Sequence, residues 1–137
     1  MIIKNDYVAD DDFEPMKIFL ITPVRNVNEE FTKYINKLID SLEAEGNTVY
    51  WPLQDTDQDD DVGLRICEDN LAAMKEADMA FYVWDGKSQD SLFDLGMAFA
   101  LNKRLFYIGM IPQAEGKSFQ NMARDWGLGL RGSYERN

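Results

Sequence analysis

The stretch from Ala77 to Ile108 constrains the fold most, because it predicts a strand, a loop, a helix and a second strand in succession. Residues 80–84 are an apolar run long enough for a buried strand, residues 85–90 are polar, and residues 105–108 are apolar again. A β–α–β unit of this kind builds parallel sheets, so the sequence predicts an α/β protein. From Ser91 onward, apolar residues recur at helical spacing: Leu92, Leu95, Gly96 and Phe99.

The loop inside this unit is where we expect a ligand, because open parallel sheets bind ligands outside the carboxyl ends of their strands. Asp85, Ser88, Ser91 and Asp94 fall at that edge, at or near a helix N-terminus that favours anions. Ser91 and Asp94 have the spacing of a capping box, in which Ser91 caps the helix. Alternatively, Asp94 projects into the crevice as a nucleophile or base, with its pKa lowered by the helix N-terminus.

The composition restricts the possible chemistry. The chain has 137 residues, which favours one domain, and a net charge of −11, which argues against a nucleic-acid duplex as partner. No apolar run approaches the roughly 18 residues of a membrane span, and no signal peptide is recognisable, so we expect a cytoplasmic protein. There is no histidine, and the single cysteine, Cys67, has the spacing of a core residue. Carboxylates are therefore the default catalytic groups if the chain is an enzyme.

We divide the whole chain into an acidic N-terminal arm, residues 1–15, and a single domain, residues 16–137. The arm is either a solvated tail or a segment that packs on a neighbouring subunit. The domain is predicted to contain further strands at 17–22 and 48–51 and further helices at 28–45, 62–76 and 118–126.

Two more loops supply candidate ligand contacts. Thr22 and Arg25 follow the first strand, where Arg25 forms either a surface salt bridge or an anion clamp. Trp51 ends the second strand and either stacks on a planar base or belongs to the core. The acidic run 55–61 lacks the Gly and Glu that a calcium loop requires, and neither Gly-Lys-Ser tripeptide has the first glycine of a P-loop. We therefore predict no metal and no cofactor.

Together, these segments resemble the nucleoside 2-deoxyribosyltransferase superfamily, most closely its branch of nucleotide N-glycosidases. The resemblance covers about residues 17–111 and is carried by KIFLITPVRN, VYWP, DNLAAMKEADMAFYVWD and SQDSLFDLGMAFALNKRLFYI. It implies a flavodoxin-like (Rossmann-like) parallel sheet of about four or five strands with helices on both faces. It also implies a homo-oligomer, a dimer or larger, whose C-terminal segment lies near a neighbour's site.

The resemblance assigns roles to particular residues. The family's nucleophile, usually a Glu, corresponds to Asp94, and a second acid on the preceding helix corresponds to Asn70, with Asp69 one residue earlier. A tyrosine that steadies the nucleophile corresponds to Phe19, which lacks the hydroxyl. Other contacts are implied for phosphate and base: Arg25, Ser88 and Ser91 for phosphate, and Trp51 or Trp84 beside the base, with Thr22 and Asp85 lining the same edge.

We therefore expect an enzyme that cleaves or transfers the N-glycosidic bond of a nucleoside or its monophosphate, with Asp94 as nucleophile or water activator. The departures at Asp94, Asn70 and Phe19 motivate an alternative, a nucleotide-binding sensor or sequestering module without turnover. An acidic interaction protein on the same scaffold fits less well, because the polar residues gather at one sheet edge.

Overall fold

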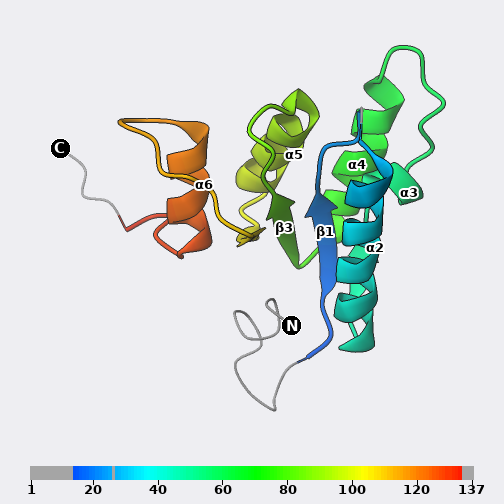
Figure 1. Cartoon of the computed structure of the whole chain (residues 1–137), viewed down its shortest axis with the longest axis horizontal. Helices are drawn as coiled ribbons and strands as arrows, with labels where there is room; N and C mark the ends of the chain where they lie inside the picture. Colours follow the sequence, from blue (N-terminus) through cyan, green and yellow to red (C-terminus); the bar gives the residue numbers. More distant parts are fainter. Residues whose placement is uncertain (1–13, 26, 134–137) are drawn as a thin grey trace.

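A computed structural model describes residues 14–25 and 27–133, so most of the predicted acidic arm and residues 134–137 lie outside the described residues. Its centre is a four-stranded parallel sheet in the order β2-β1-β3-β4. This confirms the predicted α/β class and the parallel sheet. The neighbouring central strands β1 and β3 are labelled in Figure 1. The strands are β1 (Lys17–Ile21), β2 (Thr48–Tyr50), β3 (Met79–Val83) and β4 (Arg104–Ile108).

In the described residues, five helices connect or follow these strands. The three that were predicted with both bounds begin and end within two residues of them, and a fourth, α5, begins two residues before Ser91. The fifth, α3, is a single turn that the sequence analysis did not predict. No helix in the described part of the chain has both the length and the apolarity needed to cross a membrane. The helices are α2 (Glu29–Ala44), α3 (Pro52–Asp55), α4 (Leu64–Glu76), α5 (Gln89–Ala100) and α6 (Phe119–Gly127).

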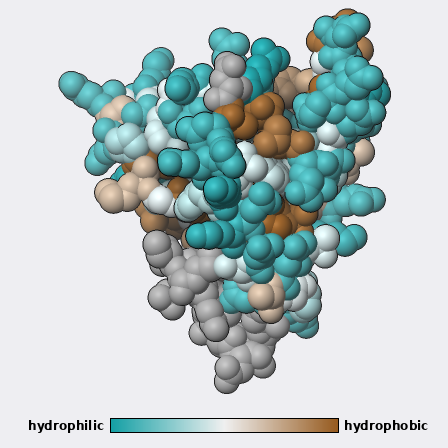
Figure 2. Space-filling view, turned by 45° about the vertical axis from the view of Figure 1, so that its right-hand side comes forward, coloured by the Kyte–Doolittle hydropathy of each residue, from teal (hydrophilic) through white to brown (hydrophobic). Residues whose placement is uncertain are grey.

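The sheet separates two hydrophobic cores because alternate residues of each strand point to opposite faces. Ile18 and Leu20 of β1 pack with the buried face of α2, whereas Phe19 and Ile21 pack with buried residues of α4, α5 and α6. The last three helices follow one another across their face of the sheet (Figure 1). Outside these cores the surface in Figure 2 is largely hydrophilic, with separate hydrophobic patches.

Two helical faces differ from the predicted ones. Helix α5 begins at Gln89, and Ser88 is its N-cap, so the predicted cap at Ser91 is wrong. The buried residues of α5 are Ser91, Asp94, Leu95 and Ala98. Two of these four residues are polar, so the buried face differs from the face that the spacing of apolar residues predicted.

In helix α4, too, a polar residue occupies a buried position. Its buried positions are Asn70 and Met74, whereas the apolar Leu64 is 66% exposed. Cys67, predicted to be a core residue, is only half-buried. A buried Asn costs free energy unless it is hydrogen-bonded, so this position needs a local partner.

The strand order creates a crevice between β1 and β3. From β1 the chain goes to β2 on one side, and β3 lies on the other side, so the loops after β1 and β3 diverge at the carboxyl edge. This is the topological switch point at which flavodoxin-like sheets bind ligands. The predicted ligand loops, 22–26 and 85–88, both begin there.

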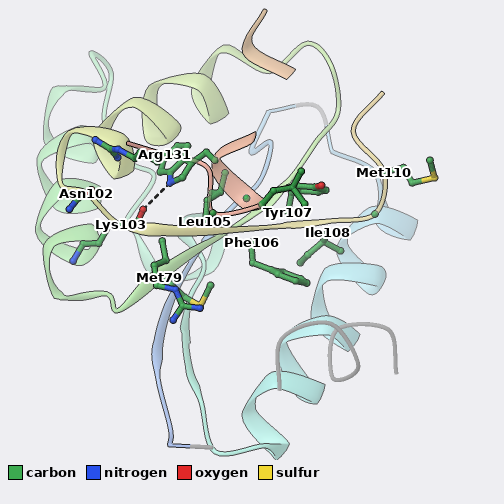
Figure 3. Close-up of a pocket in the computed structure, with 15 residues that line it drawn as sticks. Met79, Asn102, Lys103, Leu105, Phe106, Tyr107, Ile108, Met110 and Arg131 are labelled. Atoms are coloured by element: carbon green, nitrogen blue, oxygen red, sulfur yellow. Dashed lines mark hydrogen bonds between the residues drawn. The ribbon is translucent and has the colours of Figure 1, made fainter. Parts of the chain in front are cut away.

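A separate cavity of about 1,020 Å³ runs along β4, whose open side pairs with no strand in the described residues (Figure 3). It is lined by β4, the end of α6 and Arg131. The Nε1 atom of Trp126 donates a hydrogen bond of 3.0 Å to the Lys103 carbonyl there. None of its lining residues belongs to the loops after β1 and β3, so this cavity is distinct from the crevice.

The contact of α6 with β4 makes a stability prediction. A Cβ atom at Gly127 would lie 2.5 Å from Cδ1 of Tyr107, whereas one at Gly96 would meet nothing within 4 Å. We expect Gly127→Ala to lower the free energy of unfolding by about 1–3 kcal/mol, because the Tyr107 ring or α6 must shift. The control Gly96→Ala, inside α5, should raise it by about 0.5–1 kcal/mol. Urea unfolding measures both, and equal effects of the two substitutions would contradict the proposed packing.

Candidate active site between the ends of β1 and β3

A cavity of about 470 Å³ lies between the loop after β1 and the loop after β3. It is large enough for a small ligand. Both walls carry charged or polar side chains at the carboxyl edge of the sheet. Its lining residues are Pro23, Arg25, Val27, Asn28, Phe31, Asp85, Lys87, Ser88, Gln89 and Asp90.

The side chain of Asp85 stabilises the loop after β3. Its Oδ1 atom accepts hydrogen bonds from the backbone N–H groups of Lys87 (3.0 Å) and Ser88 (2.9 Å), and Gly86, which directly follows Asp85, has a φ of +80°. Ser88 Oγ then accepts from the Ser91 N–H at 3.2 Å, which caps α5. The Ser88 hydroxyl proton remains available for a ligand, because capping uses only an oxygen lone pair.

Arg25 reaches across the cavity from the opposite loop. Its Nε atom lies 3.3 Å from Oδ2 of Asp90, and its side chain is 81% exposed. A pair this exposed contributes little to stability. The surface salt bridge predicted as one of two alternatives is thus present, and it holds the cation at the mouth of the cavity.

Asp94 lies one helical turn beyond Asp90, on the packed face of α5, and is 6% exposed. Burial and, to a smaller extent, the negative charge of Asp90 raise the pKa of its carboxyl, a hydrogen bond from Asn70 lowers it, and the net result is a pKa of about 7. The predicted lowering of this pKa by the helix N-terminus is therefore wrong. Asp94 is the sixth residue of α5, beyond the first turn where the helix dipole acts, and desolvation dominates.

Asn70 and Asp69 lie in different environments although they are neighbours in the sequence. Asn70 is 6% exposed and faces Asp94, whereas Asp69 is on the exposed side of α4. Oδ2 of Asp69 accepts a hydrogen bond of 2.7 Å from Nη1 of Arg65. Of these two predicted site residues, the structure brings only Asn70 to Asp94.

The two predicted base-stacking tryptophans also differ. Trp51 is 2% exposed and its Nε1 donates to Thr22 Oγ1 at 2.9 Å, so both residues are part of the core. Trp84 is half-buried and meets the ring of Tyr82 edge-on, with centroids 6.3 Å apart. Trp84 is therefore the tryptophan with accessible surface near the cavity.

Phe19 is fully buried, and Tyr50 of β2 stacks on it with ring centroids 5.6 Å apart. The Tyr50 hydroxyl lies 2.5 Å from Thr56 Oγ1, which donates to Asn70 Oδ1 at 2.7 Å. Sequence analysis missed Tyr50 and Thr56, because their meeting depends on the unpredicted turn α3. The only signal was a polar Asn at a buried helical position.

Two further observations describe the polar groups around the site. Ser91 Oγ is the one buried side-chain nitrogen or oxygen in the described part of the chain that lacks a hydrogen-bond partner. Among the same residues, no group of three or more His, Cys, Asp or Glu side chains could hold a metal ion.

A parallel sheet in this strand order, with a cavity at its switch point and a buried carboxylate one helical turn beyond the cavity wall, defines an α/β protein of the flavodoxin-like class. The family model of nucleoside 2-deoxyribosyltransferase matches residues 18–122, and the chain belongs to this family. No curated protein matches the sequence.

Solved structures share the fold. A 2-deoxyribosyltransferase from Bacillus psychrosaccharolyticus superposes with a TM-score of 0.58 at 22% identity, covering 78% of this chain and 90% of that one. The CMP N-glycosidase BcmB from Clostridium botulinum gives 0.51 at 22% identity over 66% and 69% of the chains. A 2-deoxyribosyltransferase from Leishmania mexicana gives 0.55 at 19% identity over 69% and 64%.

The raised pKa of Asp94 makes stability depend on pH. The folded state holds this proton more tightly than the unfolded state between about pH 4 and 7, so its stability falls as the pH rises through that window. We expect Asp94→Asn, which carries no charge, to be more stable than the wild type at pH 8. The gain is at most about 4 kcal/mol, and it should vanish toward pH 4. Urea unfolding at both pH values tests this, and a pH-independent difference would contradict it.

Proposed function

We propose that this protein cleaves or transfers the N-glycosidic bond of a nucleoside or a nucleoside monophosphate, with Asp94 as the reacting carboxylate. The observation that carries the proposal is the buried Asp94, whose pKa lies near neutrality, which faces Asn70 and which lies one helical turn beyond Asp90 of the cavity wall. A carboxylate with such a pKa is ionised in about half of the molecules at pH 7, and its poor solvation increases its reactivity.

In the proposed reaction, an ionised Asp94 oxygen bonds to the anomeric carbon while the bond from that carbon to the base nitrogen breaks. The bonding electron pair leaves with the base, which takes up a proton from water. Water then releases the sugar from its ester with Asp94, or a second base displaces it. Asn70, as an amide, orients sugar hydroxyls and is not an acid.

A phosphate group of the substrate fits the cationic and helix-terminal side of the cavity. Arg25, Lys87 and Ser88 line it, and Ser88 is the N-cap of α5, so the N-terminus of this helix lies in the same region. We assign Ser91 a supporting role because its hydroxyl is buried and unpartnered just inside the helix. Trp84 provides the accessible aromatic surface for the base, and Asp85 shapes the loop.

The alternative function is a nucleotide-binding module without turnover. It is favoured by the side chains at three positions: Asp94 has a shorter side chain than the Glu usual in the family, Asn70 is an amide, and Phe19 has no hydroxyl. A misplacement of about 1 Å can cost about a hundredfold in rate. The homo-oligomeric state and the cytoplasmic location stay predictions from the sequence.

The decisive experiment is chromatography for free base. Ribo- and deoxyribonucleosides and their monophosphates are incubated with the protein, with and without a second base. We expect Asp94→Ala to lower base release by at least about a thousandfold, because it removes the nucleophile. The matched control is Asp40→Asn, an exposed carboxylate on α2, which should behave as the wild type.

The outcomes separate the functions. Base exchange identifies a transferase, and release without exchange identifies a hydrolase. Tight nucleotide binding without any product supports the binding module, and undiminished release by Asp94→Ala refutes the assignment of the nucleophile.

The pH profile gives a second test. Because the nucleophile must be ionised, base release from a nucleoside without phosphate should rise with pH through about 7 and then level off. A rate that is already constant between pH 5 and 6 would show that an ionised Asp94 does not limit the reaction.

A further inference from the structure

The buried amide of Asn70 carries an inference about how Asp94 is held. An amide side chain has a donor end and an acceptor end, and which one faces Asp94 decides whether the ionised or the protonated carboxyl is favoured. A group that donates to the Asn70 oxygen fixes the orientation of the amide and leaves its N–H₂ group to face Asp94. The structure shows which group donates to this oxygen.

The partner is Thr56, which is 4% exposed and lies 14 residues before Asn70 in the sequence. The Thr56 hydroxyl donates to Asn70 Oδ1 at 2.7 Å. Since a hydroxyl has one proton, the 2.5 Å contact of Thr56 with the Tyr50 hydroxyl must have Tyr50 as donor. These two hydrogen bonds therefore point the same way, from Tyr50 to Thr56 to Asn70, so the Asn70 N–H₂ group is the end that can donate to Asp94.

The backbone keeps Thr56 in place. Pro52 starts the single turn α3, and the Thr56 N–H donates to the Pro52 carbonyl at 3.1 Å. The side chain of Asp55 accepts from the Trp51 N–H at 2.8 Å, and Gln58 Nε2 donates to the carbonyls of Pro52 (2.8 Å) and Thr56 (3.2 Å). This turn is held by local hydrogen bonds, so the Thr56 hydroxyl has a fixed position beneath α4.

We propose that Thr56 is a positioning residue of the active site, whose hydroxyl, oriented by Tyr50, turns the amide of Asn70 so that it donates to the ionised carboxylate of Asp94. This inference rests on the proposed function for its effect on activity, but the geometry that it describes does not. Without the Thr56 hydroxyl, the Asn70 oxygen loses its buried donor, and the amide can rotate so that its oxygen accepts a hydrogen bond from the protonated carboxyl of Asp94.

The other titratable groups around Asp94 do not take part in this chain. Asp90, four residues earlier on α5, is paired with Arg25, and Cys67 on α4 has a thiol whose pKa is raised by burial. Tyr82 belongs to the sheet, and burial raises the pKa of its hydroxyl to about 12, so the hydroxyl stays neutral near pH 7. A substitution at Thr56 removes no hydrogen bond that the structure gives to these residues.

The test compares Thr56→Val, which keeps the shape and removes the hydroxyl, with Thr56→Ser, which keeps the hydroxyl. The titration of Asp94 is followed by NMR of its ¹³C-labelled carboxyl, with Asp94→Asn to assign the signal. We expect Thr56→Val to raise the pKa of Asp94, since a hydrogen bond that favours the ionised form is lost. Thr56→Ser should restore the wild-type titration.

Activity is the second readout. In Thr56→Val, base release at pH 7 should fall by about tenfold, and its rise with pH should move to higher pH in step with the NMR titration. If neither the wild type nor the variant releases base but the titration moves, the positioning role holds and the glycosidic function fails.

A titration of Asp94 that is unchanged in folded Thr56→Val would overturn the proposal. If Thr56→Val does not fold, Tyr50→Phe takes its place, because it removes only the first donor of the chain. We expect a smaller rise in the pKa of Asp94 there, and no rise would overturn the proposal as well.

Discussion

The site depends on the burial of one carboxylate on the packed face of a helix. Asp94 occupies a position of α5 where an apolar residue would stabilise the fold more, and the loss of hydration raises its pKa toward neutrality. The local structure around it compensates in part. Asn70 faces it from α4, and the two polar residues meet because both helices cover the same face of the sheet.

This arrangement also explains why the site lies where it does. The order β2-β1-β3-β4 brings the loops after β1 and β3 together, and the capped start of α5 follows directly from the second of them. One turn further along α5 the helix enters the core. The Arg25–Asp90 pair therefore lines the cavity, and Asp94 is buried one helical turn beyond this pair.

The sequence predicted the parallel sheet, its strands and most helix bounds, because β1 and β3 are continuous apolar runs and α2 has a clean apolar stripe. It failed at α5 and α4, where Ser91, Asp94 and Asn70 occupy buried positions that a hydrophobic pattern assigns to apolar residues. The sign of the pKa change at Asp94 could not be predicted either, because it depends on burial and not on distance from the helix end. The contacts of Thr56 depend on a one-turn helix too short to show periodicity.

The open side of β4 has a consequence for how the molecules behave at high concentration. An unpaired strand edge can recruit the same edge of another molecule and extend a sheet indefinitely. Here the cavity along that edge is lined by the cations Lys103, Arg104 and Arg131, and Lys103 is tied down by hydrogen bonds to the carbonyls of Lys75 and Ala77. Two such edges brought together would place like charges side by side. The repulsion between these cations therefore disfavours pairing of two β4 edges. The net charge of −11 adds repulsion between whole molecules.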